Sequence, residues 1–208
     1  MNNADTETTY TSSLTSKGSL IEETITVFEL VDAGLEKSEI KKRVLENGIA
    51  GGDTYGTRES IWDDINSRYF TKNQNLCTIA KFIINVPDKD TQKFALFYEL
   101  CQSSPILKDT TIECVYPRYT AGFSNIRSEI ILQFLDEKSE NHPEINNWSN
   151  STKEKLIRNI LTILRDFGLL TGKNTKKYQR IYIPLQAFIY VLYRLSDQGL
   201  KSALEIIN

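Results

Sequence analysis

Residues 151–183 read STKEKLIRNILTILRDFGLLTGKNTKKYQRIYI, and their pattern decides the fold of the C-terminal part of the chain. Apolar residues recur at helical spacing through 156–167, and Gly168 predicts that this helix ends in a left-handed cap. Two short strands, 169–171 and 178–183, are predicted to follow and to pair around an intervening turn. A helix followed directly by a hairpin is typical of a winged helix.

A final amphipathic helix is predicted after Pro184. Ser151 with Glu154 has the spacing of a capping box at the start of the earlier helix. Helix, hairpin and closing helix together predict a C-terminal winged-helix module over 146–208. The closing helix has large apolar residues on the side that we expect to face the core, namely Leu185, Phe188, Ile189, Leu192 and Leu195.

The rest of the chain is also predicted to be mainly helical. Three short helices in 14–71 are compatible with a helix-turn-helix-like N-terminal module, and helices separated by proline and glycine fill the middle region 72–145. The stretch NHPEINN at 141–147 is the predicted linker to the C-terminal module. Residues 1–13 are polar and rich in threonine and serine, and we expect them to form a disordered tail. The expected fold class is therefore mainly α, with one small β-hairpin.

The C-terminal module carries the chain's excess of positive charge. The whole chain has a formal net charge of −2, which is unusual for a nucleic-acid binder, but residues 151–180 hold eight basic and two acidic residues. Such asymmetry is typical of a polyanion site. Arg158, Thr162 and Arg165 form one helical ridge that could bond phosphates or base edges. The candidate DNA-binding residues are Lys155, Arg158, Thr162, Arg165, Lys173, Lys176, Lys177 and Arg180.

The predicted helix 57–70 of the N-terminal module is a poorer candidate for reading bases. Its outward side is expected to carry carboxylates that would repel phosphate. We expect this module to contact protein, or to touch DNA only at its edge. The outward residues are Glu59, Ser60, Asp63, Asp64 and Ser67, and the secondary contacts to DNA or protein are Lys41, Lys42, Arg43 and Arg58.

The sequence holds no motif that supports catalysis. The single histidine, His142, lies in the predicted linker, so no Ser–His–Asp or Cys–His arrangement is supported. Cys77, Cys101 and Cys114 form no CxxC pair, which argues against a zinc site and favours thiols in a reducing compartment. The glycine-rich loop 48–56 lacks the ending of a phosphate-binding loop. We expect a non-enzymatic protein with no cofactor, no metal and no small-molecule substrate.

The sequence gives no sign of a membrane location. The longest apolar runs, such as 187–193, are far shorter than the ~20 residues that cross a bilayer. The N-terminal stretch MNNADTETTYTSS lacks the basic flank and apolar run of a signal peptide. We therefore expect a cytoplasmic protein with no membrane partner.

Several stretches carry a resemblance to a known family. They are SLTSKGSLIEETITVFELVDAG (13–34), RESIWDDINSRYF (58–70), ELCQSSPILKDTTIECVYPRYTAG (99–122), and WSNSTKEKLIRNILTILRDFGLLTGKNTKKYQRIYIP (148–184) followed by AFIYVLY. Over about 14–205 the sequence resembles BrxA proteins, small components of BREX (bacteriophage exclusion) phage-defence systems. The resemblance implies a helical protein with helix-turn-helix or winged-helix modules toward both ends. It also implies double-stranded DNA binding beside the BREX methyltransferase, ATPase and phosphatase-like components, and it brings no enzymatic motif.

Three functional hypotheses follow. The leading one is a non-enzymatic, double-stranded DNA-binding accessory protein of a BREX-type system, with phosphate contacts dominant and sequence preference weak. The alternative is a protein-interaction adaptor that docks other defence subunits without binding DNA directly. RNA binding is a third class, for which Tyr178 and Tyr182 are the only hint of aromatic stacking.

Overall fold

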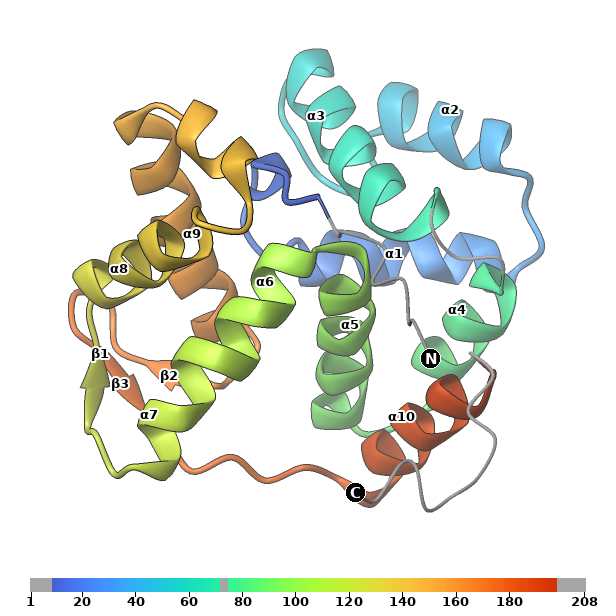
Figure 1. The fold of residues 1–208 in the computed structure, drawn as a ribbon. Coiled ribbons are helices and arrows are strands. Elements are labelled where there is room, and N and C mark those ends of the chain that lie inside the picture. The colour runs from blue at the N-terminus through green and yellow to red at the C-terminus, as the bar shows by residue number, and fades with distance from the viewer. Residues whose placement is uncertain (1–8, 72–74, 198–208) are drawn as a thin grey trace, which may run out of the picture. The chain divides into compact units, whose positions relative to one another are not determined.

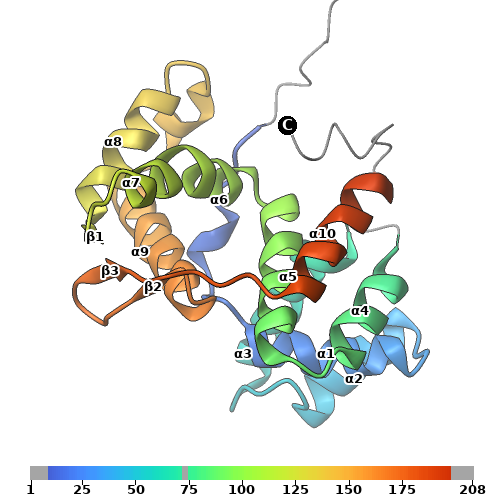
Figure 2. The ribbon, with the colours of Figure 1, turned by 90° about the horizontal axis from the view of Figure 1, so that it is seen from below.

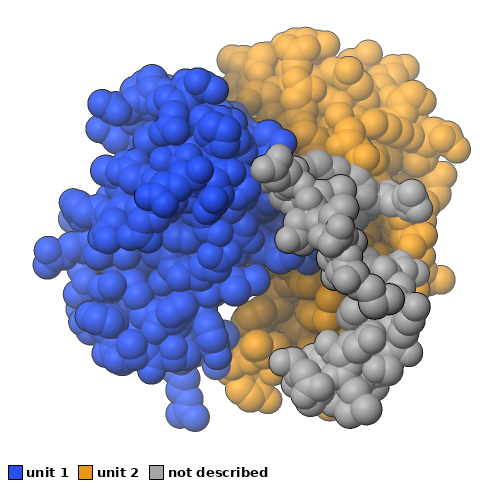
Figure 3. All heavy atoms as spheres, viewed as in Figure 1, with its two compact units in different colours: residues 1–19, 101–181 blue, residues 20–100, 182–208 orange. Residues whose placement is uncertain are grey.

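The computed structural model describes residues 9–71 and 75–197 of the 208-residue chain. The described fold is mainly helical with one small antiparallel sheet, which confirms the predicted fold class (Figure 1). The chain divides into two compact units, each assembled from two separate stretches of sequence (Figure 3). Unit 1 comprises residues 1–19 and 101–181, and unit 2 comprises residues 20–100 and 182–208.

Unit 1 combines a short N-terminal turn with helices and the sheet. The π-helical segment η3 joins α6 to α7 without a break, so that the three form one continuous helical stretch (Figure 1). The described elements of unit 1 are η1 (Ser13–Thr15), α6 (Pro105–Asp109), η3 (Thr110–Val115), α7 (Tyr116–Thr120), β1 (Asn125–Ile126), α8 (Ser128–Lys138), η4 (Pro143–Asn147), α9 (Asn150–Asp166), β2 (Leu170–Thr171) and β3 (Lys176–Tyr178).

The sheet of unit 1 has β3 at its centre, in the order β1-β3-β2, with both pairings antiparallel. Thr171 lies opposite Lys177 in the hairpin, and Ile126 of β1 lies opposite Lys176. The predicted second strand, 178–183, is therefore placed too late in the sequence. Because β1 and β2 offer only two paired positions each, pairing ends at Tyr178, and the chain runs on without strand structure to α10.

Helix α9 has the amphipathic character that its sequence predicts, because its apolar side is buried throughout. Its C-terminal end is a Schellman motif: Leu169 N–H donates to the Leu164 carbonyl at 2.8 Å, and Gly168 N–H donates to the Arg165 carbonyl at 2.9 Å. Gly168 has a φ of +82°, as predicted. The N-terminal end differs from the predicted capping box, because Ser149 is the cap and its hydroxyl accepts the Thr152 N–H at 3.2 Å.

Unit 2 is built from helices alone in its described part. Phe28, Trp62, Ile65 and Tyr69 are almost fully buried in its core, and the rings of Phe28 and Tyr69 meet edge to face with centroids 5.4 Å apart. The elements are α1 (Ile21–Asp32), α2 (Lys37–Asn47), α3 (Tyr55–Ile65), the π-helical segment η2 (Asn66–Phe70), α4 (Leu76–Asn85), α5 (Lys89–Ser103, which ends in unit 1) and α10 (Leu185–Asp197).

The closing helix, α10, belongs to unit 2 and turns a different side inward from the one predicted. It packs beside α4 and α5 (Figure 2) and buries Ala187, Tyr190 and Arg194, whereas the predicted core residues Leu185, Phe188 and Ile189 are exposed. The cause is Glu99 of α5, which is fully buried and requires donors. Tyr190 Oη donates to Glu99 Oε1 at 2.6 Å, and Arg194 Nε donates to the same oxygen at 2.7 Å.

The predicted linker contains a helix, and part of the predicted disordered tail is ordered. In the predicted linker, residues 143–147 form the 3-10 helix η4, and Ile145 is fully buried. In the predicted disordered tail, residues 9–13 are described and Tyr10 is only 2% exposed, while residues 1–8 lie outside the described part. Apolar anchoring explains both, because Ile145 and Tyr10 each contribute buried surface to unit 1.

Candidate nucleic-acid interface

Unit 1 carries a groove that brings the predicted helical ridge and the hairpin turn together. Its volume is about 710 Å³, and it is lined by α9, by the turn between β2 and β3, and by the residues where β1 passes into α8. Lys173 of the turn faces the same groove as Arg158, Thr162 and Arg165 of α9. The groove lining thus holds five of the eight predicted DNA-binding residues, these four and Lys176 of β3.

The lining of this groove is strongly cationic. Five of its side chains are basic and only one, Glu129, is a carboxylate. A concave surface of one sign concentrates the electrostatic potential and attracts an opposite charge. The basic residues are Arg127, Arg158, Arg165, Lys173 and Lys176.

Arg158 is the most available cation of the helical ridge. Its side chain is exposed, and no hydrogen bond or ion pair involves its guanidinium among the residues that the structure describes. Thr162 lies one turn further on, and its hydroxyl donates to the Arg158 carbonyl at 2.9 Å. The Thr162 oxygen can therefore still accept a hydrogen bond, but its proton is already used within the helix.

Arg165 is held within the molecule. Its Nε and Nη2 donate to Asp166 Oδ1 at 3.0 and 2.7 Å. The second oxygen of that carboxylate, Oδ2, accepts the Ser19 hydroxyl at 2.8 Å. The charge of Arg165 is thereby largely compensated, and its side chain is about one-third exposed. Arg165 can contribute to the groove's potential, but it is a weaker phosphate donor than Arg158.

Lys176 is buried, which differs from its expected place on an exposed wing. It is 8% exposed, and its Nζ donates to the carbonyls of Gly172 at 3.0 Å and Lys173 at 2.7 Å. These bonds hold the turn closed from inside. Burial is the main cause that lowers the pKa of Lys176, and the nearby Arg165 charge lowers it further. The ammonium therefore shapes the turn and does not project from it.

The other predicted residues of this region are exposed but lie outside the groove lining. Lys155 is one turn or less from Arg158 on α9, Lys177 belongs to β3, and Arg180 follows that strand. Each can add to the positive potential near the groove. None has a hydrogen-bond or ion-pair partner among the described residues, and all three remain candidates for contacts at its rim.

Arg127, the exposed residue that precedes α8, is not among the residues that the sequence predicts for this site. Its place in the groove depends on the pairing of β1 with β3, which joins Asn125 to Lys177 across more than fifty residues of sequence. The local sequence shows only a basic residue directly before the helix start at Ser128, which does not by itself place Arg127 in the groove. The N-terminal end of a helix adds a partial positive charge to such a site.

The N-terminal segment 9–19 covers the polar side of α9 that carries Asn159. Asn159 Nδ2 donates to the Leu14 carbonyl at 2.7 Å, and η1 packs on the helix. Tyr10 anchors the start of the segment: its N–H donates to Glu144 Oε1 at 2.7 Å, and its ring stacks on His142 with centroids 3.9 Å apart. The side of α9 expected to face solvent is thus only partly free.

The secondary candidates belong to unit 2, and one of them is structural. Arg58 Nε donates to the Gly52 carbonyl at 2.9 Å, and its Nη1 lies 3.2 Å from the carbonyl oxygens of both Leu45 and Glu46 at the end of α2. Arg58 therefore caps the C-terminal end of α2 by satisfying its last carbonyl groups. Arg43 is exposed and pairs with Glu39 at 3.0 Å, and Lys41 and Lys42 are exposed. The predicted acidic side of helix 57–70 exposes fewer carboxylates than expected, because Asp64 is buried.

Two further features of the described residues bear on function. Over residues 9–71 and 75–197, no group of three or more histidine, cysteine or carboxylate side chains is placed to hold a metal ion. In the same part of the chain, every helix is too short or too polar to pass through a lipid bilayer.

The fold and the groove define a class: a mainly helical protein with a small three-stranded sheet and a cationic groove beside it. The chain belongs to the BrxA family, whose family model matches residues 8–192, and this membership suggests a role in BREX phage defence. The crystal structure of an uncharacterized protein from Magnetospirillum magneticum is similar, with a TM-score of 0.75 and 17% sequence identity, over 91% of this chain and 95% of that chain. That likeness concerns the fold alone. No curated protein matches the chain.

Proposed function

We propose that this protein is a non-enzymatic accessory component of BREX phage defence that binds double-stranded DNA in the cationic groove of unit 1. The observation that supports the proposal is the convergence of Arg127, Arg158 and Lys173 on one exposed concave surface. They come from three separate elements, so their meeting is a property of the fold. Phosphate groups are the natural ligands of such a surface.

The order of elements in unit 1 supports the same proposal. A helical stretch (α6 to α7) is followed by β1, α8, α9 and the hairpin β2–β3, with the sheet order β1-β3-β2. This is the order of a winged helix, in which the second helix of the helix-turn-helix pair enters the major groove and the hairpin is the wing. Here these parts are α9 and the turn 172–175. In this proposal the winged-helix unit spans 105–178, whereas the sequence predicted 146–208.

Binding should depend mainly on phosphates and only weakly on sequence. A DNA major groove about 12 Å wide accepts a helix, but few side chains of α9 are free to read bases. Thr162 has already used its proton, Asn159 bonds Leu14, and Arg165 bonds Asp166. Contacts from Arg127, Arg158 and Lys173 would position the duplex without reading it.

The test is a fluorescence anisotropy titration of a labelled duplex of about 20 base pairs, two helical turns, at several salt concentrations. Combined Arg127→Ala, Arg158→Ala and Lys173→Ala should weaken binding and reduce the slope of log K against log salt by ~2.7, about 0.9 for each lost contact. The matched control removes three cations of unit 2, Lys81, Lys89 and Lys93, which all lie outside the groove. It should leave the slope close to that of the wild type.

A variant that removes a negative charge from the groove provides a second test, because it should strengthen DNA binding. Glu129 is the single carboxylate of the groove lining, so Glu129→Gln should tighten binding by removing a repulsion with phosphate. Equal losses in the groove variant and the unit 2 control would show that only net charge matters. The groove proposal would then be abandoned.

The remaining BREX components are the proposed protein partners. Under the adaptor hypothesis the protein would bind these components and would not bind DNA. Capture from a nuclease-treated lysate separates the two functions. If defence subunits are retained by a chain that shows no affinity for naked duplex at low salt, the protein is an adaptor. Retention that is lost with nuclease treatment supports the DNA-binding proposal.

A further inference from the structure

The groove of unit 1 has two walls that carry positive charge. One is α9, which contributes Arg158, and the other is the turn between β2 and β3, whose exposed residues Lys173, Asn174 and Thr175 all line the groove. Its volume of about 710 Å³ is smaller than a cube whose edge is the ~12 Å width of the DNA major groove. The groove is therefore too small for a duplex, and it suits a short stretch of one sugar–phosphate strand, whose phosphates repeat every ~3.4 Å.

A strand lying between these walls determines which groove of the duplex each wall meets. In a duplex, a sugar–phosphate strand separates the major groove on one side from the minor groove on the other. A helix needs the wide major groove, so α9 takes that side. The turn 172–175 then lies at the adjacent minor groove, which is ~6 Å wide and admits only a narrow element.

The turn is a firmly held projection without negative charge. Lys176 Nζ donates to the carbonyls of Gly172 at 3.0 Å and Lys173 at 2.7 Å, which fixes the backbone of the residue that carries the exposed ammonium. No carboxylate occurs between Asp166 and the start of α10 at Leu185. Because the turn is already ordered, it loses little conformational entropy when it binds.

The exposed side chains of the turn favour A·T base pairs in a minor groove. Lys173 ends in an ammonium group, which can only donate hydrogen bonds. A·T pairs present only acceptors at the floor of the minor groove, whereas G·C pairs add the guanine amino group, which is itself a donor. A-tracts also have a narrow minor groove, whose stronger negative potential attracts lysine.

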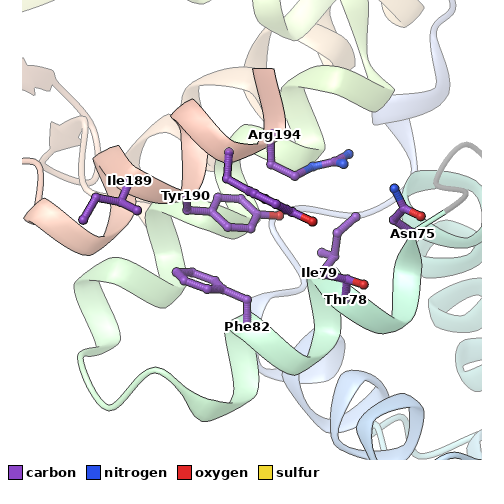
Figure 4. A pocket seen from close by; sticks show the side chains of 8 residues that line it. Asn75, Thr78, Ile79, Phe82, Ile189, Tyr190 and Arg194 are labelled. Carbon is purple, nitrogen blue, oxygen red and sulfur yellow. The ribbon is translucent and has the colours of Figure 1, made fainter. Parts of the chain in front are cut away.

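A hollow in unit 2 lacks these properties. It has a volume of about 300 Å³ between α4 and α10, and its apolar wall includes Ile79, Phe82 and Tyr190 (Figure 4). The basic residue of its lining, Arg194, bonds Glu99 at 2.7 Å. Positive charge available on two separate walls therefore distinguishes the groove of unit 1 from this hollow.

We propose that one strand of a bound duplex runs along the groove of unit 1 and that the turn 172–175 enters the adjacent minor groove, where Lys173 favours A·T base pairs. This inference rests on the proposed DNA binding and adds a base-composition preference to it. The Lys173 charge still neutralises the flanking phosphates, so the preference is confined to A·T against G·C and leaves other sequence differences unread.

The test compares the affinity of the full chain for three labelled duplexes of about 20 base pairs that differ only in about six central pairs. These pairs are A·T, G·C or inosine–cytosine. An inosine–cytosine pair resembles G·C in the major groove, but it lacks the guanine amino group and so resembles A·T in the minor groove. The A·T and inosine duplexes should both bind at least about 5-fold more tightly than the G·C duplex, a difference of about 1 kcal/mol.

The variants assign the preference to the turn. Lys173→Ala, at an exposed position, should remove the preference, and Lys173→Arg should keep it. The matched control is Lys177→Ala, because Lys177 is an exposed lysine of the same hairpin outside the groove lining; any affinity that it loses should be lost equally on all three duplexes. An inosine duplex that binds like the G·C duplex, or a preference that survives Lys173→Ala, overturns the inference and leaves DNA binding standing. Failure to bind any of the three duplexes overturns both proposals.

Discussion

Replacing Arg194 with alanine should destabilise unit 2 far more than loss of an ordinary ion pair. Arg194 is 6% exposed, and its guanidinium contacts both oxygens of Glu99, at 2.7 Å from Nε and 3.3 Å from Nη2. Without it, the Tyr190 hydroxyl would be the one remaining partner of this fully buried carboxylate among the residues that the structure describes. Breaking a buried pair on one side costs about 3–5 kcal/mol.

The measurement is urea unfolding followed by tryptophan fluorescence in a Trp148→Phe background, where Trp62, buried in unit 2, is the single tryptophan. Arg43→Ala is the matched control, because its ion pair with Glu39 has both side chains nearly half exposed. Such a pair contributes about 0–1 kcal/mol. Tyr190→Phe should cost about 1.5–3 kcal/mol, the range for hydrogen bonds to charged groups.

The pairing of Arg194 with Glu99 also predicts that replacing both residues restores stability. Because replacing both members of a buried pair by apolar residues is often close to neutral, Arg194→Met combined with Glu99→Leu should recover most of the stability lost in Arg194→Ala. Two results would refute the reasoning. One is a loss for Arg194→Ala no larger than for Arg43→Ala, and the other is a double variant that is less stable than Arg194→Ala.

Two further predictions concern a buried thiol and the hairpin turn. Burial raises the pKa of Cys101 to about 12, so the folded state keeps a proton that the unfolded thiol releases above about pH 8.5. The free energy of unfolding should fall as pH rises from about 8.5 toward that value, by up to about 1.4 kcal/mol per pH unit, and Cys101→Ala should remove this contribution in alkaline urea titrations. Gly172 has a φ of +87°, and an added Cβ would lie 2.2 Å from the Thr175 carbonyl oxygen. Gly172→Ala should therefore cost about 1–3 kcal/mol and weaken duplex binding by displacing Lys173, whereas Gly34→Ala, with an open space at a φ of +79°, should leave binding unchanged.

The parts of the fold that the sequence predicts well are those whose signals are local. The period of α9, the left-handed Gly168 and the turn that begins at Gly172 each depend on neighbouring residues. The ridge of Arg158, Thr162 and Arg165 follows from the same period, and the structure places all three beside one groove.

The parts that could not be predicted depend on residues far away in the sequence. Which side of α10 turns inward is decided by Glu99, 95 residues before Arg194. Arg127 joins the groove only because β1 pairs with β3. Tyr10 is held by burial and by its hydroxyl, which donates to Asp109, 99 residues away. Periodicity measures how apolar each side of a helix is, but it does not reveal a buried carboxylate on another element that needs donors.

The segment 9–19 engages polar side chains of α9 that could otherwise read bases in the proposed DNA complex. The Leu14 carbonyl of this segment accepts a hydrogen bond from the Asn159 side chain. The Ser19 hydroxyl donates to the Asp166 carboxylate, which also accepts the bonds from Arg165. These bonds fix the rotation of α9 about its axis, so that Arg158 is the ridge cation left free to face the groove. A helix held in this way presents positive charge at a constant position, which suits phosphates that recur along any duplex. Adaptable contacts to particular bases would require the very side chains that the segment has already engaged.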